Sequence, residues 1–140
     1  MKAWTVGTST RSLNEFLKLL KQYGIQSVVD VRRFPTSRFE YFRKERLQEI
    51  LLQNGIEYHH LEGLGGYRGG YQEYMRSVEF AKAFSQLLRI IKKNRTAILC
   101  AELLFFRCHR RFISDSLVEQ GIRVVHILDG KISYTHRPLE

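Results

Sequence analysis

Cysteine is scarce in this sequence, and long apolar runs are missing. The 140 residues contain two cysteines, Cys100 and Cys108, too few for the disulfide framework of a small secreted protein. No stretch approaches the ~20 apolar residues of a membrane-spanning helix, and the first ten residues lack the apolar core of a signal peptide. These absences predict a cytoplasmic protein with no membrane association, in which both cysteines are free thiols.

Acidic residues are also few relative to basic ones. The sequence has 14 Asp and Glu against 23 Lys and Arg, which gives a formal net charge of +9. A positive field of this size raises the local concentration of anions. The charge therefore favours an anionic ligand, a nucleotide or nucleic acid, as the partner. In the alternative interpretation, the basic residues only keep helix faces soluble.

Short apolar segments alternate with segments of helical periodicity along the whole chain. Gly24, Gly55 and Gly121 follow three of the periodic segments, as glycine does at helix ends. Continuous apolar strands joined by helices predict one three-layer α/β domain over residues 1–140, with helices on both faces of a mostly parallel five-stranded sheet. We expect residues 130–140 to form a polar, loosely held tail. The predicted strands are 3–6, 27–31, 56–60, 96–101 and 123–128.

The first predicted strand ends in a short run of hydroxyl side chains. Ligands of open parallel sheets bind beyond the carboxyl ends of the strands, so the loops at that edge are the places to search for a site. Thr8, Ser9 and Thr10 follow Gly7 and precede a helix, where backbone amides and hydroxyls form a natural cradle for an anion. The alternative is that these residues only cap the helix.

Charged side chains follow the second predicted strand. Asp30 ends this strand and is followed by Arg32 and Arg33, which are suited to binding phosphate in a bidentate manner. The Asp30 carboxylate is then in place to orient these arginines or to accept a proton. A structural ion pair that only holds the loop is the alternative.

Two cysteine motifs flank the loop after the fourth predicted strand. Cys100 and Glu102 end the strand, and Cys108, His109 and Arg110 open the next helix. A helix N-terminus and nearby arginines stabilise a thiolate, so we expect a lowered pKa for Cys108, with Glu102 and His109 as acid and base. In the alternative interpretation both cysteines are small buried hydrophobic residues.

Other chemistry fits the cysteine spacing less well. A phosphatase-type loop requires Cys-x5-Arg, but Phe106 stands where that arginine belongs, and Arg107 comes one position late. Zinc ligation lacks any Cys-x2-Cys pair, so we predict neither a metal site nor a cofactor. A disulfide between the two cysteines is a further alternative, because their spacing permits it. The apolar segment 103–106 is predicted to line a base-stacking pocket, to form a homodimer contact or to join the core.

The order of these motifs resembles that of the domain-of-unknown-function 488 family. The blocks that carry the resemblance extend from the Gly-Thr-Ser-Thr run to the Cys-His-Arg motif. The resemblance implies that the cysteine motifs matter, and it implies no particular reaction. The blocks are 7–10, 30–35, 64–66, 71–75, 100–102 and 108–110.

Three functional hypotheses follow from these patterns. The first is an enzyme acting on a phosphate-bearing substrate, a nucleotide or nucleic acid, at a Cys/Glu/His/Arg site on the carboxyl edge of the sheet. The second is a non-catalytic nucleic-acid-binding module in which Tyr67, Tyr71 or Phe105 stacks on bases. The third is a redox sensor built on the two cysteines.

Overall fold

In its described residues the protein forms one sheet of six strands, five of which run parallel. The computed structural model describes residues 1–66 and 69–138. The strand order is β3-β2-β4-β1-β5-β6, and the last strand is antiparallel to its neighbour. The predicted α/β class and mostly parallel sheet are confirmed. The strands are β1 (Lys2–Gly7), β2 (Ser27–Asp30), β3 (Glu57–His60), β4 (Thr96–Cys100), β5 (Arg123–Ile127) and β6 (Ser133–Thr135).

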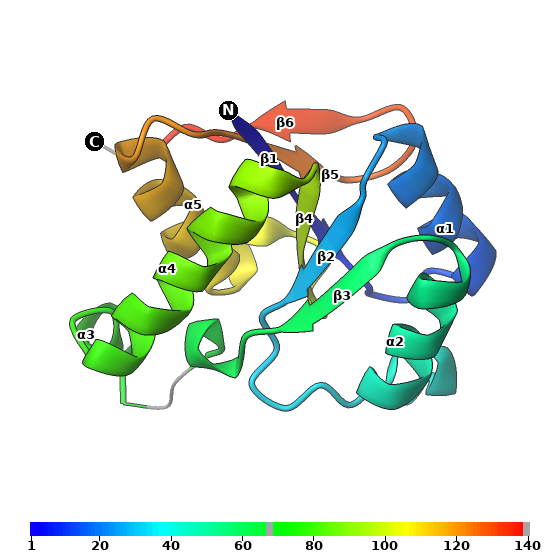
Figure 1. The fold of residues 1–140 in the computed structure, drawn as a ribbon, viewed down its shortest axis with the longest axis horizontal. Helices are drawn as coiled ribbons and strands as arrows, with labels where there is room; N and C mark the ends of the chain where they lie inside the picture. The colour runs from blue at the N-terminus through cyan, green and yellow to red at the C-terminus, as the bar shows by residue number, and fades with distance from the viewer. Residues whose placement is uncertain (67–68, 139–140) are drawn as a thin grey trace.

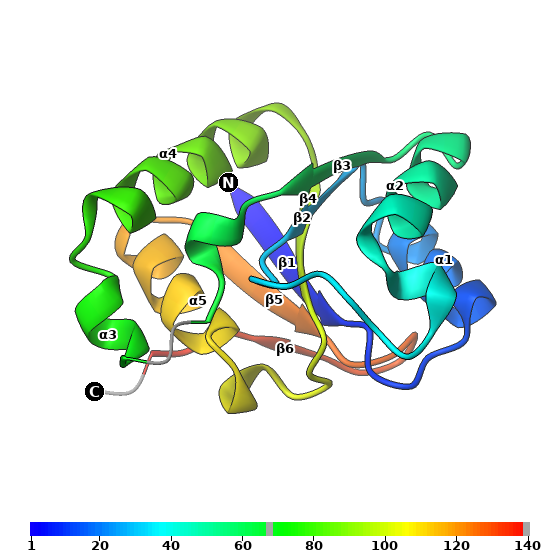
Figure 2. The same ribbon diagram turned by 90° about the horizontal axis from the view of Figure 1, so that it is seen from below.

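Helices cover both faces of the sheet (Figures 1 and 2). Helices α1 and α2 lie on one face over an apolar cluster that contains Trp4, Phe16 and Leu47. Helices α4 and α5 lie on the other face over a second cluster, which contains Leu87 and Ile113. None of the described helices is long and apolar enough to cross a membrane. The helices are α1 (Leu13–Gln22), α2 (Lys44–Gln53), α3 (Tyr71–Tyr74), α4 (Val78–Lys93) and α5 (Arg110–Glu119).

The helix ends follow from local sequence chemistry. Ser12 caps α1 in a full capping box with Glu15. Ser77 caps α4, because its side chain accepts a hydrogen bond from the amide of Phe80. Such caps satisfy amides that the first helical turn leaves without a partner. Helix α5 begins at Arg110, later than the spacing predicts, so Cys108 lies in the loop before the helix. Three short 3-10 turns complete the connections: η1 (Glu40–Phe42), η2 (Glu62–Leu64) and η3 (Phe105–Arg107).

The strand order creates a diverging pair of loops at the carboxyl edge of the sheet. Strand β4 lies between β1 and β2, but the loop after β4 leads to α5 on one face, while the loops after β1 and β2 lead to α1 and α2 on the other. Such a divergence is where ligands of open α/β sheets bind. Gly7 allows the close approach of the two loops, because a Cβ atom at Gly7 would lie 1.8 Å from the carbonyl oxygen of Glu102.

The sixth strand lies in the segment expected to be a loose tail. Residues Ser133–Thr135 pair with β5, and His136 behind them is buried. The residues of β6 are themselves exposed, so they carry the polar sequence of a tail while using the sheet edge for their backbone hydrogen bonds. Tyr67, a candidate for base stacking, lies outside the described residues.

Candidate functional site

Cys100, Cys108 and Arg110 form a compact cluster at the carboxyl edge of the sheet. The two sulfur atoms lie 3.1 Å apart, and both cysteines are free thiols. Arg110 donates its Nε–H to the Cys108 sulfur over 3.1 Å and its backbone amide to the same atom over 3.4 Å. Because both of these Arg110 groups are N–H donors, the Cys108 sulfur must act as acceptor in both contacts. The geometry favours a thiolate at Cys108.

Opposite pKa shifts separate the two thiols. The hydrogen bond from Cys100 and the positive charge of Arg110 lower the pKa of Cys108 to about 6, against the effect of burial. The same hydrogen bond, together with burial, raises the pKa of Cys100 well above its ordinary value. Cys100 is therefore the donor of the shared proton and Cys108 the charged partner. The predicted direction of the Cys108 shift agrees with this arrangement.

Arg110 is the most deeply buried charge next to this cluster. Its side chain is 1% exposed, and none of the ion pairs found within residues 1–66 and 69–138 involves it. Its Nη2 donates to the Glu102 carbonyl over 2.5 Å, and its Nη1 to Thr5 Oγ1 over 3.4 Å. Because a buried cation needs a compensating negative charge, the thiolate of Cys108 is the natural counter-ion for Arg110.

A chain of buried hydrogen bonds runs from Arg110 to the molecular surface. Thr5 Oγ1 lies 2.6 Å from His126 Nδ1, His126 Nε2 lies 2.8 Å from His136 Nδ1, and His136 Nε2 lies 2.6 Å from an oxygen of Asp115. The Asp115 carboxylate only accepts, so His136 Nε2 donates to it, and the guanidinium of Arg110 donates to Thr5 at the other end of these contacts. Burial lowers the pKa of His126 to about 3, which keeps its ring neutral.

Sequence reasoning missed this series of hydrogen bonds from Arg110 to Asp115. Thr5 and His126 are brought together by the pairing of β1 with β5, in which they are register partners. His136 reaches its position only because β6 pairs with β5. The one available signal was His126 itself, a titratable residue inside an apolar strand, but its partners depend on strand order.

His109 and Glu102 flank the cluster in different ways. His109 Nε2 donates to the carbonyl of Val31 over 2.9 Å, so in the neutral ring Nδ1 is the unprotonated nitrogen. Burial lowers the pKa of His109, which keeps it neutral and suits it to accept a proton. Glu102 contributes its backbone carbonyl to Arg110, and the residue is exposed.

Asp30 and Arg32 bind each other away from the cysteines. Arg32 donates Nε and Nη2 to the two carboxylate oxygens of Asp30 over 2.9 and 2.7 Å, and Tyr58 donates its hydroxyl over 2.6 Å. Successive side chains of a strand point to opposite faces, and Val29 packs in the same cluster as Cys100, so Asp30 faces the other side of the sheet. The structure does not bring Asp30 or Arg32 to the thiols, and the geometry matches a structural ion pair.

The hydroxyl run after β1 serves the neighbouring loop. The amide of Thr8 donates to the Cys100 carbonyl over 2.8 Å, and the amide of Ser9 donates to the Ala101 carbonyl over 2.9 Å. Both amides are thus used within the protein, while Thr10 is exposed. This loop holds the backbone around Cys100 in place, and the geometry gives little support to an anion cradle there.

Arg33 remains at the same edge as the thiols. Its Nε donates to the Gly66 carbonyl over 2.7 Å, and its guanidinium lies 5.3 Å from the ring centre of Tyr74. Its positive charge acts on His109, whose pKa it helps to lower after the larger effects of burial and Arg110. Arg33 therefore contributes to a positive potential around the cysteine cluster.

An apolar cavity of about 300 Å³ adjoins the cluster. The segment 103–106 forms one wall, and Phe105 stacks on His126 with ring centres 3.6 Å apart. Of the interpretations predicted for this segment, the pocket wall is the one that the structure supports. The other lining residues are Arg110, His126, Ile127, Leu128 and Tyr134.

The sequence matches a known protein family over most of its length. The family model described as "Domain of unknown function DUF488" matches residues 12–117. The chain belongs to the DUF488 family. The match confirms the resemblance inferred from the motifs, and the DUF488 region includes both cysteine motifs while leaving out the run 7–10 and strand β5. No curated protein matches the sequence significantly.

The described part of this DUF488 chain shows no arrangement of three or more His, Cys, Asp or Glu side chains that would hold a metal ion. The thiol cluster instead pairs sulfur with a guanidinium. The site is therefore best described as a dithiol with an arginine counter-ion.

Replacing Asp30 with alanine should destabilise the fold strongly. The substitution leaves the Arg32 guanidinium, 5% exposed, without its carboxylate, and breaking a buried ion pair costs about 3–5 kcal/mol. Chemical denaturation measures the free energy of unfolding. Glu49→Ala is the matched control, since it removes a carboxylate from an exposed pair with Arg46 and should change stability by less than about 1 kcal/mol. Equal effects of the two variants would show that the buried pair does not hold the loop.

Alkylation of Cys108 should follow a thiolate with a midpoint near pH 6, because its pKa is lowered to about 6. The rate of reaction with iodoacetamide, measured from pH 4 to 10 by peptide mass spectrometry, tests this. Cys100→Ala removes the S–H donor and should move the midpoint upward, whereas Cys100→Ser keeps a donor and should move it less. A midpoint at or above ~8.5, the value of a free thiol, would contradict the assignment.

Proposed function

We propose that the protein is a cysteine-dependent enzyme that acts on a phosphate-bearing substrate of nucleotide size. The observation that carries the proposal is the Cys108 sulfur, which lies 3.1 Å from Cys100 Sγ and 3.1 Å from Arg110 Nε. Reactive thiols are activated in this way by a neighbouring cation and hydrogen-bond donors. A cysteine with only a packing role would not need a buried guanidinium beside it.

The surroundings of the thiols favour an anionic substrate with a flat apolar part. Arg11, Arg33 and Arg110 contribute positive charge near the cluster, and Arg11 is fixed by donating to the carbonyls of Gly7 and Leu128. The adjoining cavity of about 300 Å³ has aromatic side chains from 105 and 106 in its wall. That volume is at the lower end for small-molecule pockets, and aromatic walls suit a nucleobase.

The residues of the cluster divide the chemical work between them. The Cys108 thiolate attacks the electrophilic atom of the substrate, and the leaving group departs with the electron pair of the broken bond. Water then attacks the cysteine-bound intermediate, its proton passes to His109 Nδ1, and the thiolate is released. Arg110 stabilises the thiolate at the start and the end of the cycle.

Cys108→Ser should lose turnover by roughly a thousandfold, as nucleophile removal does in other covalent enzymes. The assay uses nucleoside mono-, di- and triphosphates and p-nitrophenyl phosphate, and follows phosphate or nitrophenolate release. Nucleotides that occupy the site should also protect Cys108 from iodoacetamide. Cys100→Ser is the matched control and should retain most activity, because its hydroxyl still donates to the Cys108 sulfur. A Cys108→Ser protein with unchanged turnover would refute the proposal.

The 3.1 Å separation of the two sulfurs supports a second candidate, a dithiol that reduces a disulfide. The Cys108 thiolate would attack the disulfide, forming a mixed disulfide and releasing one thiol. Cys100 would then attack Cys108, releasing the second thiol and leaving a Cys100–Cys108 disulfide. In this case Cys100→Ser abolishes one complete round of reduction of oxidised glutathione by an equivalent of the reduced protein, as completely as Cys108→Ser does, so the same pair of variants separates the two candidates.

A further inference from the structure

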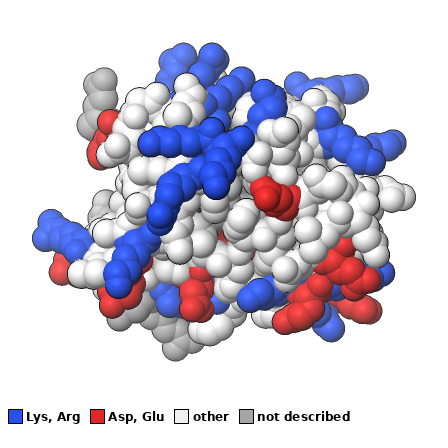
Figure 3. Space-filling view, viewed as in Figure 1, with Lys and Arg blue, Asp and Glu red and all other residues white. Residues whose placement is uncertain are grey.

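The outer face of α4 carries a row of exposed cations. Lys82, Arg89 and Lys93 lie on this helix together with Gln86, and all four are exposed. At about 100° per residue they fall within about 60° of one another around the helix axis. Figure 3 shows the basic side chains as a diagonal band over α4. We call Lys82, Arg89 and Lys93 the α4 stripe.

The position of the stripe follows from the amphipathic sequence of α4. Phe80, Leu87 and Ile91 are buried against the sheet on the opposite side of the helix, so the charged side chains must point to solvent. The ion pairs among the described residues all involve other side chains. Within the described part of the protein, no member of the stripe is held in an ion pair.

Carboxylates lie beside both ends of the stripe: Glu62 and Glu79 line a hollow with Lys82, and Glu57 lies at the other end. Glu57 shares a small hollow with Arg89 and Lys93. Its Oε2 accepts a hydrogen bond from Ser27 over 2.9 Å and another from Asn94 over 2.5 Å. These hydrogen bonds from neutral groups hold the Glu57 carboxylate against the strand ends and leave its negative charge in place, so attraction of a ligand depends on the stripe together with the cations that continue it.

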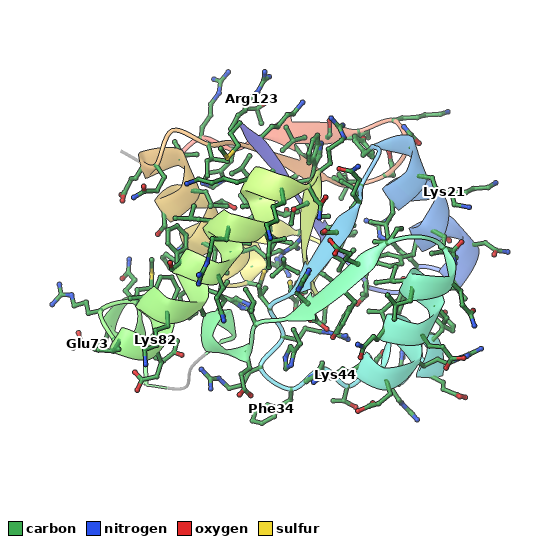
Figure 4. The ribbon with its side chains drawn as sticks, in the orientation of Figure 1. Lys21, Phe34, Lys44, Glu73, Lys82 and Arg123 are labelled. Carbon is green, nitrogen blue, oxygen red and sulfur yellow. The ribbon has the colours of Figure 1, made fainter. Side chains whose placement is uncertain are left out.

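More cations continue the stripe at the amino edge of the sheet. A hollow of about 270 Å³ there is lined by Lys2, Lys92, Lys93 and Arg95. Two of them make cation–π contacts with Trp4. The Arg95 guanidinium lies 4.3 Å and the Lys2 ammonium 5.2 Å from the ring centre of Trp4. Figure 4 places Arg123 at this same end and Lys82 near the other end of α4. The basic surface thus extends from Lys82 to the carboxyl end of α4 and on to the amino edge of the sheet.

We infer that this surface binds the sugar-phosphate backbone of a nucleic acid. The eleven residue steps from Lys82 to Lys93 span about 16 Å along a helix, which matches roughly five base-pair steps of 3.4 Å in a duplex. A row of lysine and arginine side chains of this length can neutralise several successive phosphates. Because such contacts touch no base edges, binding is independent of sequence.

The same features argue against an anionic membrane as the partner. A helix that lies in a membrane surface buries its apolar face in the lipid. The apolar face of α4 is already covered by the sheet, where Leu87 is fully buried. The cations alone would contact a lipid surface, with no apolar anchor between them.

The test is binding of fluorescein-labelled 20-base-pair DNA and RNA duplexes and a 20-nucleotide single strand, measured by anisotropy from 50 to 200 mM KCl. The triple variant Lys82→Ala, Arg89→Ala, Lys93→Ala should lose affinity about tenfold or more at 50 mM salt. Its salt dependence should fall by about 2–3 in log–log slope, because three phosphate contacts disappear at about 0.9 each. DNA and RNA duplexes should bind with similar affinity.

A second triple variant provides the matched control. Lys18, Lys21 and Lys131 are exposed on other parts of the surface, and Figure 4 shows Lys21 on α1, away from α4. Changing these three to alanine removes the same net charge and should alter affinity less than about twofold. Cys108→Ser should bind like the wild type, so this proposal can fail independently of the thiol chemistry.

Three results would overturn the inference. The first is no binding of any oligonucleotide at 50 mM salt. The second is equal weakening by the two triple variants, which would reduce the effect to net charge. The third is tight binding of phosphatidylglycerol vesicles, lost in the α4 triple variant, without binding of the duplexes; this result would assign the stripe to a membrane surface.

Discussion

The buried guanidinium of Arg110 is the group on which the carboxyl edge of the sheet depends. It is 1% exposed, and a charge in that position costs several kcal/mol unless it is paired and hydrogen-bonded. Backbone carbonyls from the loop after β4, the hydroxyl of Thr5 in β1 and the sulfur of Cys108 together meet that need. The requirements of one cation therefore bring together segments that are distant in the sequence.

The same requirement separates the properties of the two thiols. Cys108 supplies negative charge to Arg110, and Cys100 stabilises that charge by donating its proton, which is why the pKa values of the pair shift in opposite directions. The amides of Thr8 and Ser9 fix the carbonyls of 100 and 101, so the donor has little freedom to move. A loop that the sequence suggests as a ligand cradle thus acts as support for the thiol pair.

Sequence patterns were sufficient for the main architecture because strands and helices alternate clearly and their ends carry ordinary caps. They were insufficient for β6, whose three exposed residues have no apolar pattern and form a strand only by using the free edge of β5. The thiol cluster was predictable, since Cys100, Cys108 and Arg110 lie close in sequence at a strand end. The chain from Thr5 to Asp115 was not, because it requires the register of β1 with β5.

Formal net charge counts every arginine and lysine alike, but the fold divides them into buried cations and cations that face solvent. Arg11, Arg32 and Arg110 are buried and bonded to carbonyls, a carboxylate or a thiol, so their charges act inside the protein, where salt screens them little. The cations on α4 face solvent, where their field extends over a Debye length of about 8–10 Å and weakens as salt is added. Chemistry at the thiols and attraction of a polyanion to α4 are therefore physically separable, and salt should suppress the second while leaving the first largely intact.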